Sequence, residues 1–122
     1  MSDQQAFGRE GESLAADHLA EKGYRILARN YQTPRGEIDI IGMEGDTIVF
    51  VEVKARRSDH FGNPKCAVTR SKQKKISMAA LHYLKSTKQS DAKARFDVVS
   101  IRSGGSDPDI ELIRSAFGLA CE

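Results

Sequence analysis

The chain has 122 residues, of which 39% are hydrophobic and 30% are charged, and its net charge is +2. This length suits one globular domain that buries its own core, so we expect a single domain over residues 1–122. The composition excludes a helical membrane span, because no run approaches the roughly 20 apolar residues that one needs, and the polar N-terminus lacks an apolar signal core, which predicts a cytoplasmic location with no membrane partner.

Helix and strand patterns follow one another along the whole chain. In chain order we expect a helix at 3–22, strands at 24–31, 37–43 and 47–54, a polar loop at 55–68, a helix at 70–87, and strands at 95–102 and 110–114. Gly23 suits the end of the first helix and Thr69 the cap of the second, and the short connection at 44–46 predicts an antiparallel hairpin. The second helix permits a parallel crossover. The order α-β-β-β-α-β-β indicates an α/β fold, with a mixed central sheet of about five strands flanked by helices.

The cysteines and histidines show no pattern of a disulfide framework or a zinc site. Cys66 and Cys121 share no close spacing. His18, His60 and His82 form no ligand motif, so we expect them to be surface or packing residues.

Residues 54–75 concentrate positive charge, with eight basic residues and one acid, which leaves the rest of the chain at −5. A basic segment on an acidic body is typical of a polyanion-binding face, although a solvated loop and helix start give the same pattern. Lys72 and Lys75 lie one helical turn apart, and Arg56 and Arg57 follow the third strand. We expect these four side chains to contact the phosphates of a nucleic acid, with DNA preferred to RNA as the partner.

Charged residues interrupt the most apolar part of the predicted hairpin. Because side chains alternate along a strand, Glu52 and Lys54 share one face of the third strand with Ile48 and Phe50. If the second and third strands pair through their short turn, Asp39 can lie near Glu52. The hairpin therefore brings two carboxylates and an ammonium into a region that otherwise resembles core.

Two carboxylates that point inward are costly unless a cation neutralises them. Carboxylate oxygens with several waters are the ligands that Mg²⁺ or Mn²⁺ takes, and such a site can hydrolyse a phosphodiester bond. On this interpretation Asp39 and Glu52 hold the metal, and Lys54 serves the nucleophile or the transition state. A solvated salt bridge, or charges that protect a sheet edge from aggregation, would produce the same residues.

Each helix adds one candidate to this site. Glu12 shares its helix flank with Ala15 and Leu19, small and apolar neighbours that allow a close approach, and we expect it to assist through the metal's waters. Gln73 lies between Lys72 and Lys75 and is expected to face the sheet with Ile76, where it could order a water or a phosphate. A basic first turn opposes the helix dipole, which mildly favours a functional role for these lysines.

These residues carry a family resemblance across nearly the whole chain. The matching pieces are Gly8-Arg9-x-Gly11-Glu12, Asn30-Tyr31, Gly36-Glu37-Ile38-Asp39-Ile40-Ile41, Phe50-Val51-Glu52-Val53-Lys54-x-Arg56, Lys72-Gln73 and Arg95-Phe96-Asp97-Val98-Val99. The sequence resembles the bacterial YraN family and, through Asp39…Glu52-Val53-Lys54, the PD-(D/E)XK nuclease superfamily. It is also similar in pattern to archaeal Holliday-junction resolvases.

The resemblance implies a restriction-endonuclease-like fold, a divalent metal and branched DNA as substrate. Carried over by position, the catalytic roles fall on Glu12, Asp39, Glu52 and Lys54, and Gln73 matches a helix-borne residue of many superfamily members. Where the superfamily has a proline before the aspartate, this chain has Ile38, which leaves the carboxylate in place.

Other functions fit the same residues. A nucleic-acid-binding module without turnover would bind in a salt-sensitive way, and an interaction protein would use a sheet edge and bind neither metal nor DNA. A resolvase cuts two strands symmetrically, which makes a homodimer possible. Phe117 and Leu119 are candidates for its surface, with core packing as the plainer explanation.

Overall fold

The computed structural model describes residues 3–57, 68–103 and 109–118. Its elements are α1 (Asp3–Glu21), β1 (Arg25–Thr33), β2 (Gly36–Glu44), β3 (Thr47–Arg57), α2 (Arg70–Ser86), β4 (Lys93–Ser103) and β5 (Asp109–Phe117). This order confirms the α/β fold expected from the sequence. Two expectations about length were wrong. β3 runs on to Arg57, into the predicted loop, and β5 continues to Phe117, because each pairs with β4 along almost its whole length.

The five strands form one mixed sheet in the order β1-β2-β3-β4-β5. Neighbouring strands are antiparallel except β3 and β4, which run parallel and are joined through α2, so the predicted crossover is confirmed. No helix in the described part of the chain is long and apolar enough to cross a membrane.

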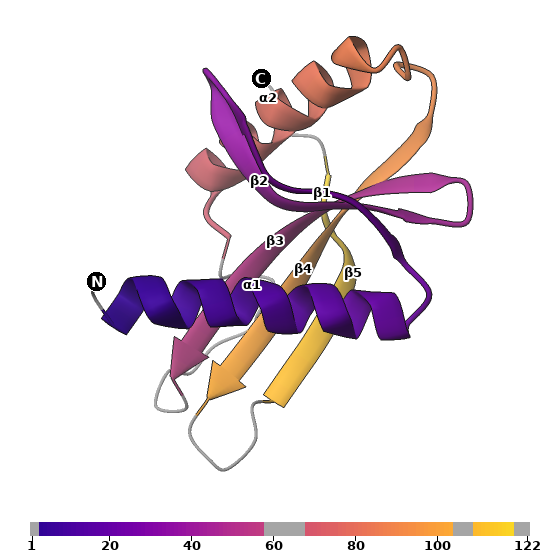
Figure 1. Ribbon diagram of the computed structural model, residues 1–122. Helices are drawn as coiled ribbons and strands as arrows, with labels where there is room; N and C mark the ends of the chain where they lie inside the picture. Colours follow the sequence, from indigo (N-terminus) through magenta and orange to yellow (C-terminus); the bar gives the residue numbers. More distant parts are fainter. Residues whose placement is uncertain (1–2, 58–67, 104–108, 119–122) are drawn as a thin grey trace.

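The two helices pack against the sheet (Figure 1). Each helix contributes to a different apolar cluster. Leu19 of α1 packs in one cluster with Val49 and Val51 of β3, whereas Ile76 of α2 packs in the other with Ile48 and Phe50. Alternation along β3 thus supplies both clusters, as the strand pattern predicts. Both sides of the sheet are core, which is why two carboxylates among these strands require an explanation.

The hairpin of β1 and β2 reaches beyond the strand that it accompanies. β1 and β2 pair as far as Thr33 opposite Gly36, whereas the pairing of β2 with β3 runs from Glu44 opposite Thr47 to Ile40 opposite Val51. The far half of the hairpin lies alongside α2 instead (Figure 1). The pairing of β2 with β3 therefore ends next to Asp39.

The tip of this hairpin is held firmly. Thr33 Oγ1 accepts hydrogen bonds from the N–H groups of Arg35 (3.2 Å) and Gly36 (3.1 Å) and donates to the Gly36 carbonyl (2.9 Å). Gly36 lies so close to α2 that a Cβ built on it would be 2.2 Å from the Lys75 carbonyl oxygen. Only glycine permits this approach, so Gly36 fixes the tip against the helix.

A buried polar network accounts for the Arg95–Val99 motif. Asp97, which is fully buried, accepts hydrogen bonds from the Tyr24 hydroxyl (3.0 Å), Arg95 Nε (3.0 Å) and the Ser115 N–H (2.9 Å). Ser115 has a positive φ of 51° and lies where the β4–β5 register shifts. The network joins the start of β1 to β4 and β5, so the motif has a structural role here.

Candidate functional site

Asp39 and Glu52 meet where β2 leaves β3. The Glu52 side chain is only 3% exposed. Asp39 Oδ2 accepts a hydrogen bond of 2.8 Å from the Val53 N–H, so Asp39 satisfies the backbone group that β2 no longer pairs. The two carboxyl groups are close enough to share a hydrogen bond, which requires a proton on one of them. The structure thus brings together the two predicted metal ligands.

Burial and mutual repulsion make this pair hard to ionise fully. Burial, followed by the charge of Asp39, raises the pKa of Glu52 to about 7. Burial also raises the pKa of Asp39, against the opposing effect of the Val53 N–H. Near neutral pH and without a bound cation, the pair therefore holds on to a proton. Perturbed carboxyl groups of this kind are typical of functional sites.

Lys72 supplies the cation that faces the pair. Its Nζ lies 3.1 Å from Glu52 Oε1, and Thr69 Oγ1, which accepts a 3.1 Å hydrogen bond from the Lys72 N–H, caps this turn of α2. Burial lowers the pKa of Lys72, but the charge and hydrogen bond of Glu52, together with the charges of Asp39 and Glu37, outweigh burial and the net shift of this pKa is upward. Sequence reasoning assigned Lys72 to phosphate contact, and the structure places it on a carboxylate. The rotation of α2 on the sheet decides this, and no local pattern encodes that rotation.

Glu12 of α1 is coupled electrostatically to Asp39. A Cβ on Gly11 would lie 3.2 Å from the Ala55 side chain, so the helix passes close to β3, as its small residues predict. Burial raises the pKa of Glu12, and the charge of Asp39 raises it further. Glu12 is therefore within electrostatic reach of Asp39, on the side of the sheet that α1 covers.

Asn30 is a site residue that sequence reasoning missed. With its amide nitrogen assigned to face Glu12, Nδ2 donates to both carboxylate oxygens, at 2.9 and 3.2 Å. Asn30 has a positive φ of 54°, a conformation that asparagine tolerates better than most residues. It belongs to the Asn30-Tyr31 piece of the family resemblance, which was the available signal.

The remaining predicted residues are placed differently. Lys54 is half-buried two positions after Glu52, opposite Ser100 of β4. Gln73 Nε2 donates to the Val68 carbonyl (2.9 Å), so its amide holds the chain that enters α2. The backbones of Arg56 and Arg57 belong to β3, and their side chains lie outside the described part of the structure.

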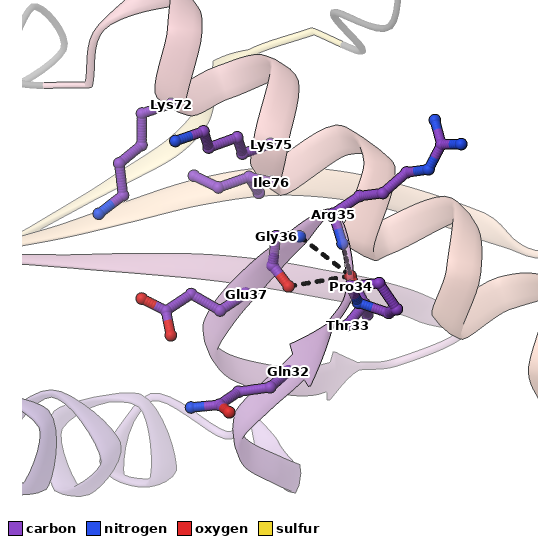
Figure 2. A pocket seen from close by; sticks show the side chains of 9 residues that line it. All are labelled: Gln32, Thr33, Pro34, Arg35, Gly36, Glu37, Lys72, Lys75 and Ile76. Atoms are coloured by element: carbon purple, nitrogen blue, oxygen red, sulfur yellow. Dashed lines mark hydrogen bonds between the residues drawn. The ribbon is translucent and has the colours of Figure 1, made fainter.

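A groove of about 500 Å³ opens beside the carboxylates, between the hairpin tip and α2. It is lined by Gln32, Thr33, Pro34, Arg35, Gly36, Glu37, Lys72, Lys75 and Ile76 (Figure 2). Asp39 and Glu52 do not line this groove, but Lys72 both lines it and contacts Glu52, so Lys72 connects the groove to the carboxylate pair. Its volume is within the range of ligand sites.

The donor atoms of the pair suit a hard divalent cation. Asp39 and Glu52 offer carboxylate oxygens, which Mg²⁺ and Mn²⁺ prefer. Among the described residues, no three side chains of the Asp, Glu, His and Cys types form a complete ligand group, so water would have to supply much of the coordination. That is how Mg²⁺ is commonly held. Asp39 and Glu52 therefore fit such an ion.

The fold and this site define an α/β protein whose mixed sheet carries a half-buried and a buried carboxylate next to each other, with a cationic groove nearby. Residues 11–101 match the family described as "Uncharacterised protein family UPF0102", and the chain belongs to that family. A UPF0102 protein of Desulfosudis oleivorans is 51% identical over 117 residues, which cover 96% of this chain and 94% of that one. A UPF0102 protein of Geobacter metallireducens is 53% identical over 115 residues, with 94% of each chain covered. Another, of Rhodococcus opacus, is 46% identical over 118 residues, with 96% and 100% covered.

Proposed function

We propose that this protein is a metal-dependent endonuclease that hydrolyses phosphodiester bonds in structured, branched DNA. We further propose that it belongs, with the YraN family that it resembles, to the PD-(D/E)XK nuclease superfamily. The observation that carries the proposal is the pairing of half-buried Asp39 with buried Glu52 on adjacent strands. A protein core gains nothing from two repelling carboxylates. As ligands of Mg²⁺ or Mn²⁺, both carboxylates would have a function.

In this proposal Asp39 and Glu52 would hold the cation. When bound, such an ion lowers the pKa of a water and neutralises charge that develops on the phosphodiester. The Val53 N–H fixes the orientation of Asp39, while Asn30 fixes that of Glu12. Lys54 follows Glu52 on the same face of β3 and would stabilise negative charge on the reacting phosphate. Gln73 would act indirectly, because its hydrogen bond to Val68 positions the turn of α2 that carries Lys72.

DNA would approach along the groove between the hairpin tip and α2. Lys75 is exposed there, and Lys72 links the groove to the carboxylates. Contacts of this kind, together with Arg56 and Arg57, hold phosphates without reading sequence. The preference for branched DNA comes from the resemblance to resolvases. Symmetric cutting of a junction would require a two-fold dimer. Phe117 offers little to its surface, because its ring stacks on Phe96 with centroids 5.0 Å apart, and Leu119 lies outside the described residues.

Cleavage of labelled DNA tests the proposal. Four-way junction, flap, single-stranded and duplex substrates are incubated with Mg²⁺ or Mn²⁺, with wild type and with Asp39→Asn and Glu52→Gln. The control is Glu111→Gln, which removes an exposed carboxylate from β5. We expect wild type and the control to cleave and both site variants to lose at least about 100-fold in rate. Equal cleavage by all four proteins would assign the activity to a contaminant and refute the site.

One observation favours a second candidate, a nucleic-acid-binding module that does not cleave. Lys72 already neutralises Glu52 in this structure, so the pair has a cation of its own. Such a module would bind DNA in a salt-sensitive way and show no cleavage with either metal. Calorimetric titration with Mn²⁺ separates the two candidates, because only the nuclease requires a binding isotherm that Asp39→Asn abolishes.

A further inference from the structure

A second groove adjoins the first at the hairpin tip. It has a volume of about 360 Å³ and is lined by Arg35, Ser71, Lys74, Lys75 and Met78. Arg35 and Lys75 line both grooves, so together they form the ridge between them. Figure 2 shows Arg35 extending away from the side on which Glu37 and Lys72 lie. The two grooves therefore make one path that starts at Lys72, whose ammonium contacts Glu52, and crosses the ridge.

The charge along this path is strongly positive. Arg35, Lys72, Lys74 and Lys75 line the two grooves, and Glu37 is the one acidic residue among the described residues that line them. The charge of Glu37 acts on the Lys72 ammonium at the end nearest the carboxylates, so the two offset each other there. The path beyond Lys72 consequently attracts a polyanion.

The path also offers apolar surface between its cations. Pro34, which is exposed, lines the first groove, and Met78, which is half-buried, lines the second. A duplex presents phosphates and sugars to a surface and keeps its bases stacked inside, so it would use the cations and leave these apolar side chains uncovered. An unpaired strand exposes both phosphates and base faces, which is what a cationic groove with packing surfaces recognises.

We propose that the two grooves form a track for an unpaired nucleic-acid strand. The track leads this strand across the hairpin tip toward Asp39 and Glu52. The inference rests on the proposed nuclease function, because that function gives the track its destination. It adds that the substrate enters with a single-stranded segment such as a flap or a frayed arm. The walls of the track are preorganised, since Gly36 abuts the Lys75 carbonyl and Thr33 closes the turn.

Fluorescence anisotropy in EDTA tests the track without cleavage. The probes are a fluorescein-labelled oligodeoxyuridylate, an oligouridylate of the same length, and a blunt DNA hairpin that is fully paired. Met78→Ala removes packing surface and no charge, Arg35→Ala removes one charge from the ridge, and Lys85→Ala removes one charge from an exposed position of α2 that lines neither groove. Thermal melts establish that each variant is folded.

We expect Met78→Ala to weaken binding of the single strands about 5-fold and to leave the hairpin within about 2-fold. Arg35→Ala should reduce the slope of log K against log salt by about 0.7 on the single strands. Lys85→Ala should stay within about 2-fold of wild type on every probe. The two single strands distinguish DNA from RNA, because a difference between them would report the sugar.

Equal weakening by Met78→Ala and Lys85→Ala, or tighter binding of the hairpin than of the single strands, would overturn the track. Failure of the nuclease proposal gives a different result. In that case the single strands bind and respond to Met78→Ala as described, while no substrate is cleaved when metal is added. If the protein cleaves DNA but Met78→Ala and Arg35→Ala both bind the single strands as wild type does, the nuclease proposal stands and the track is refuted.

Discussion

Glu52 is a carboxylate placed where a protein ordinarily puts an apolar side chain. Phe50, on the same face of β3, is 1% exposed, and Glu52 is 3% exposed. Its nearest charges have opposite effects, since Asp39 raises and Lys72 lowers the pKa of Glu52, and burial exceeds both. The result is a group that the fold tolerates best when it is protonated or when it is paired with a cation.

This conflict predicts a pH-dependent stability. The pKa of Glu52 rises from 4.5 to about 7 on folding, so its contribution to stability is fully present below pH 4.5 and is lost as pH rises through about 7. Relative to wild type, Glu52→Gln should gain on the order of 3 kcal/mol in free energy of unfolding between pH 4.5 and pH 8. Urea unfolding in EDTA at both pH values measures the gain, with Glu111→Gln as the exposed control. A constant difference across this range would show that Glu52 ionises normally.

Lys72 should contribute more to the free energy of unfolding at high pH than at low pH. Lys72→Met leaves Glu52 without its cation, and because the Lys72 side chain is 40% exposed we expect a loss of only about 1 kcal/mol at pH 8. At pH 5, where Glu52 is protonated, the loss should fall toward zero. Lys74→Met, an exposed neighbour on α2, is the matched control in thermal melts at the two pH values. Equal losses for the two variants would mean that the 3.1 Å ion pair adds nothing to stability.

At the scale of elements, the strand and helix patterns were sufficient to predict their order, the β2–β3 hairpin and the parallel crossover. Alternation in β3 correctly assigned Ile48 and Phe50 to one side and Val49 and Val51 to the other. These properties depend on local periodicity and connection length, which a sequence displays directly.

The arrangement of the site was less predictable, because it depends on how elements meet. The Lys72–Glu52 contact requires the rotation of α2 on the sheet, and the role of Gln73 requires the path of the chain at Val68. The placement of Asn30 depends on one unusual backbone angle in β1, its positive φ. Each is a tertiary property, so residue types and spacing suggested the participants without their contacts.

The hairpin tip gives a prediction at this scale. Gly36→Ala would place a Cβ 2.2 Å from the Lys75 carbonyl oxygen, and because that atom is backbone, either the hairpin or α2 must move. We expect a loss of about 1–3 kcal/mol in free energy of unfolding, and weaker single-strand binding if the track is correct. Gly118→Ala is the control, since a Cβ there meets no atom within 4 Å. Unaltered stability in Gly36→Ala would show that the tip is not held against the helix.

At the scale of the whole molecule, one sheet separates two apolar clusters, and β3 and β4 contribute to both. Val98 of β4 belongs to the cluster under α2, and Val99 belongs to the one under α1. Losing either helix would expose one face of strands whose other face remains packed. The two clusters therefore depend on each other through shared backbone, which makes one cooperative unit the physical expectation.

This coupling predicts that damage on either side lowers the stability of the whole chain. Leu19→Ala and Ile76→Ala each remove a fully buried side chain, one from each cluster, and each should cost about 2–5 kcal/mol. In both variants, urea transitions followed by far-UV circular dichroism and by tyrosine fluorescence should coincide. Leu81→Ala, which truncates a side chain that is 39% exposed, is the control and should cost less than about 1 kcal/mol. Separate transitions in Leu19→Ala would mean that the α1 side unfolds by itself, and Glu12 could then leave the site while Asp39, Glu52 and Lys72 stay in place.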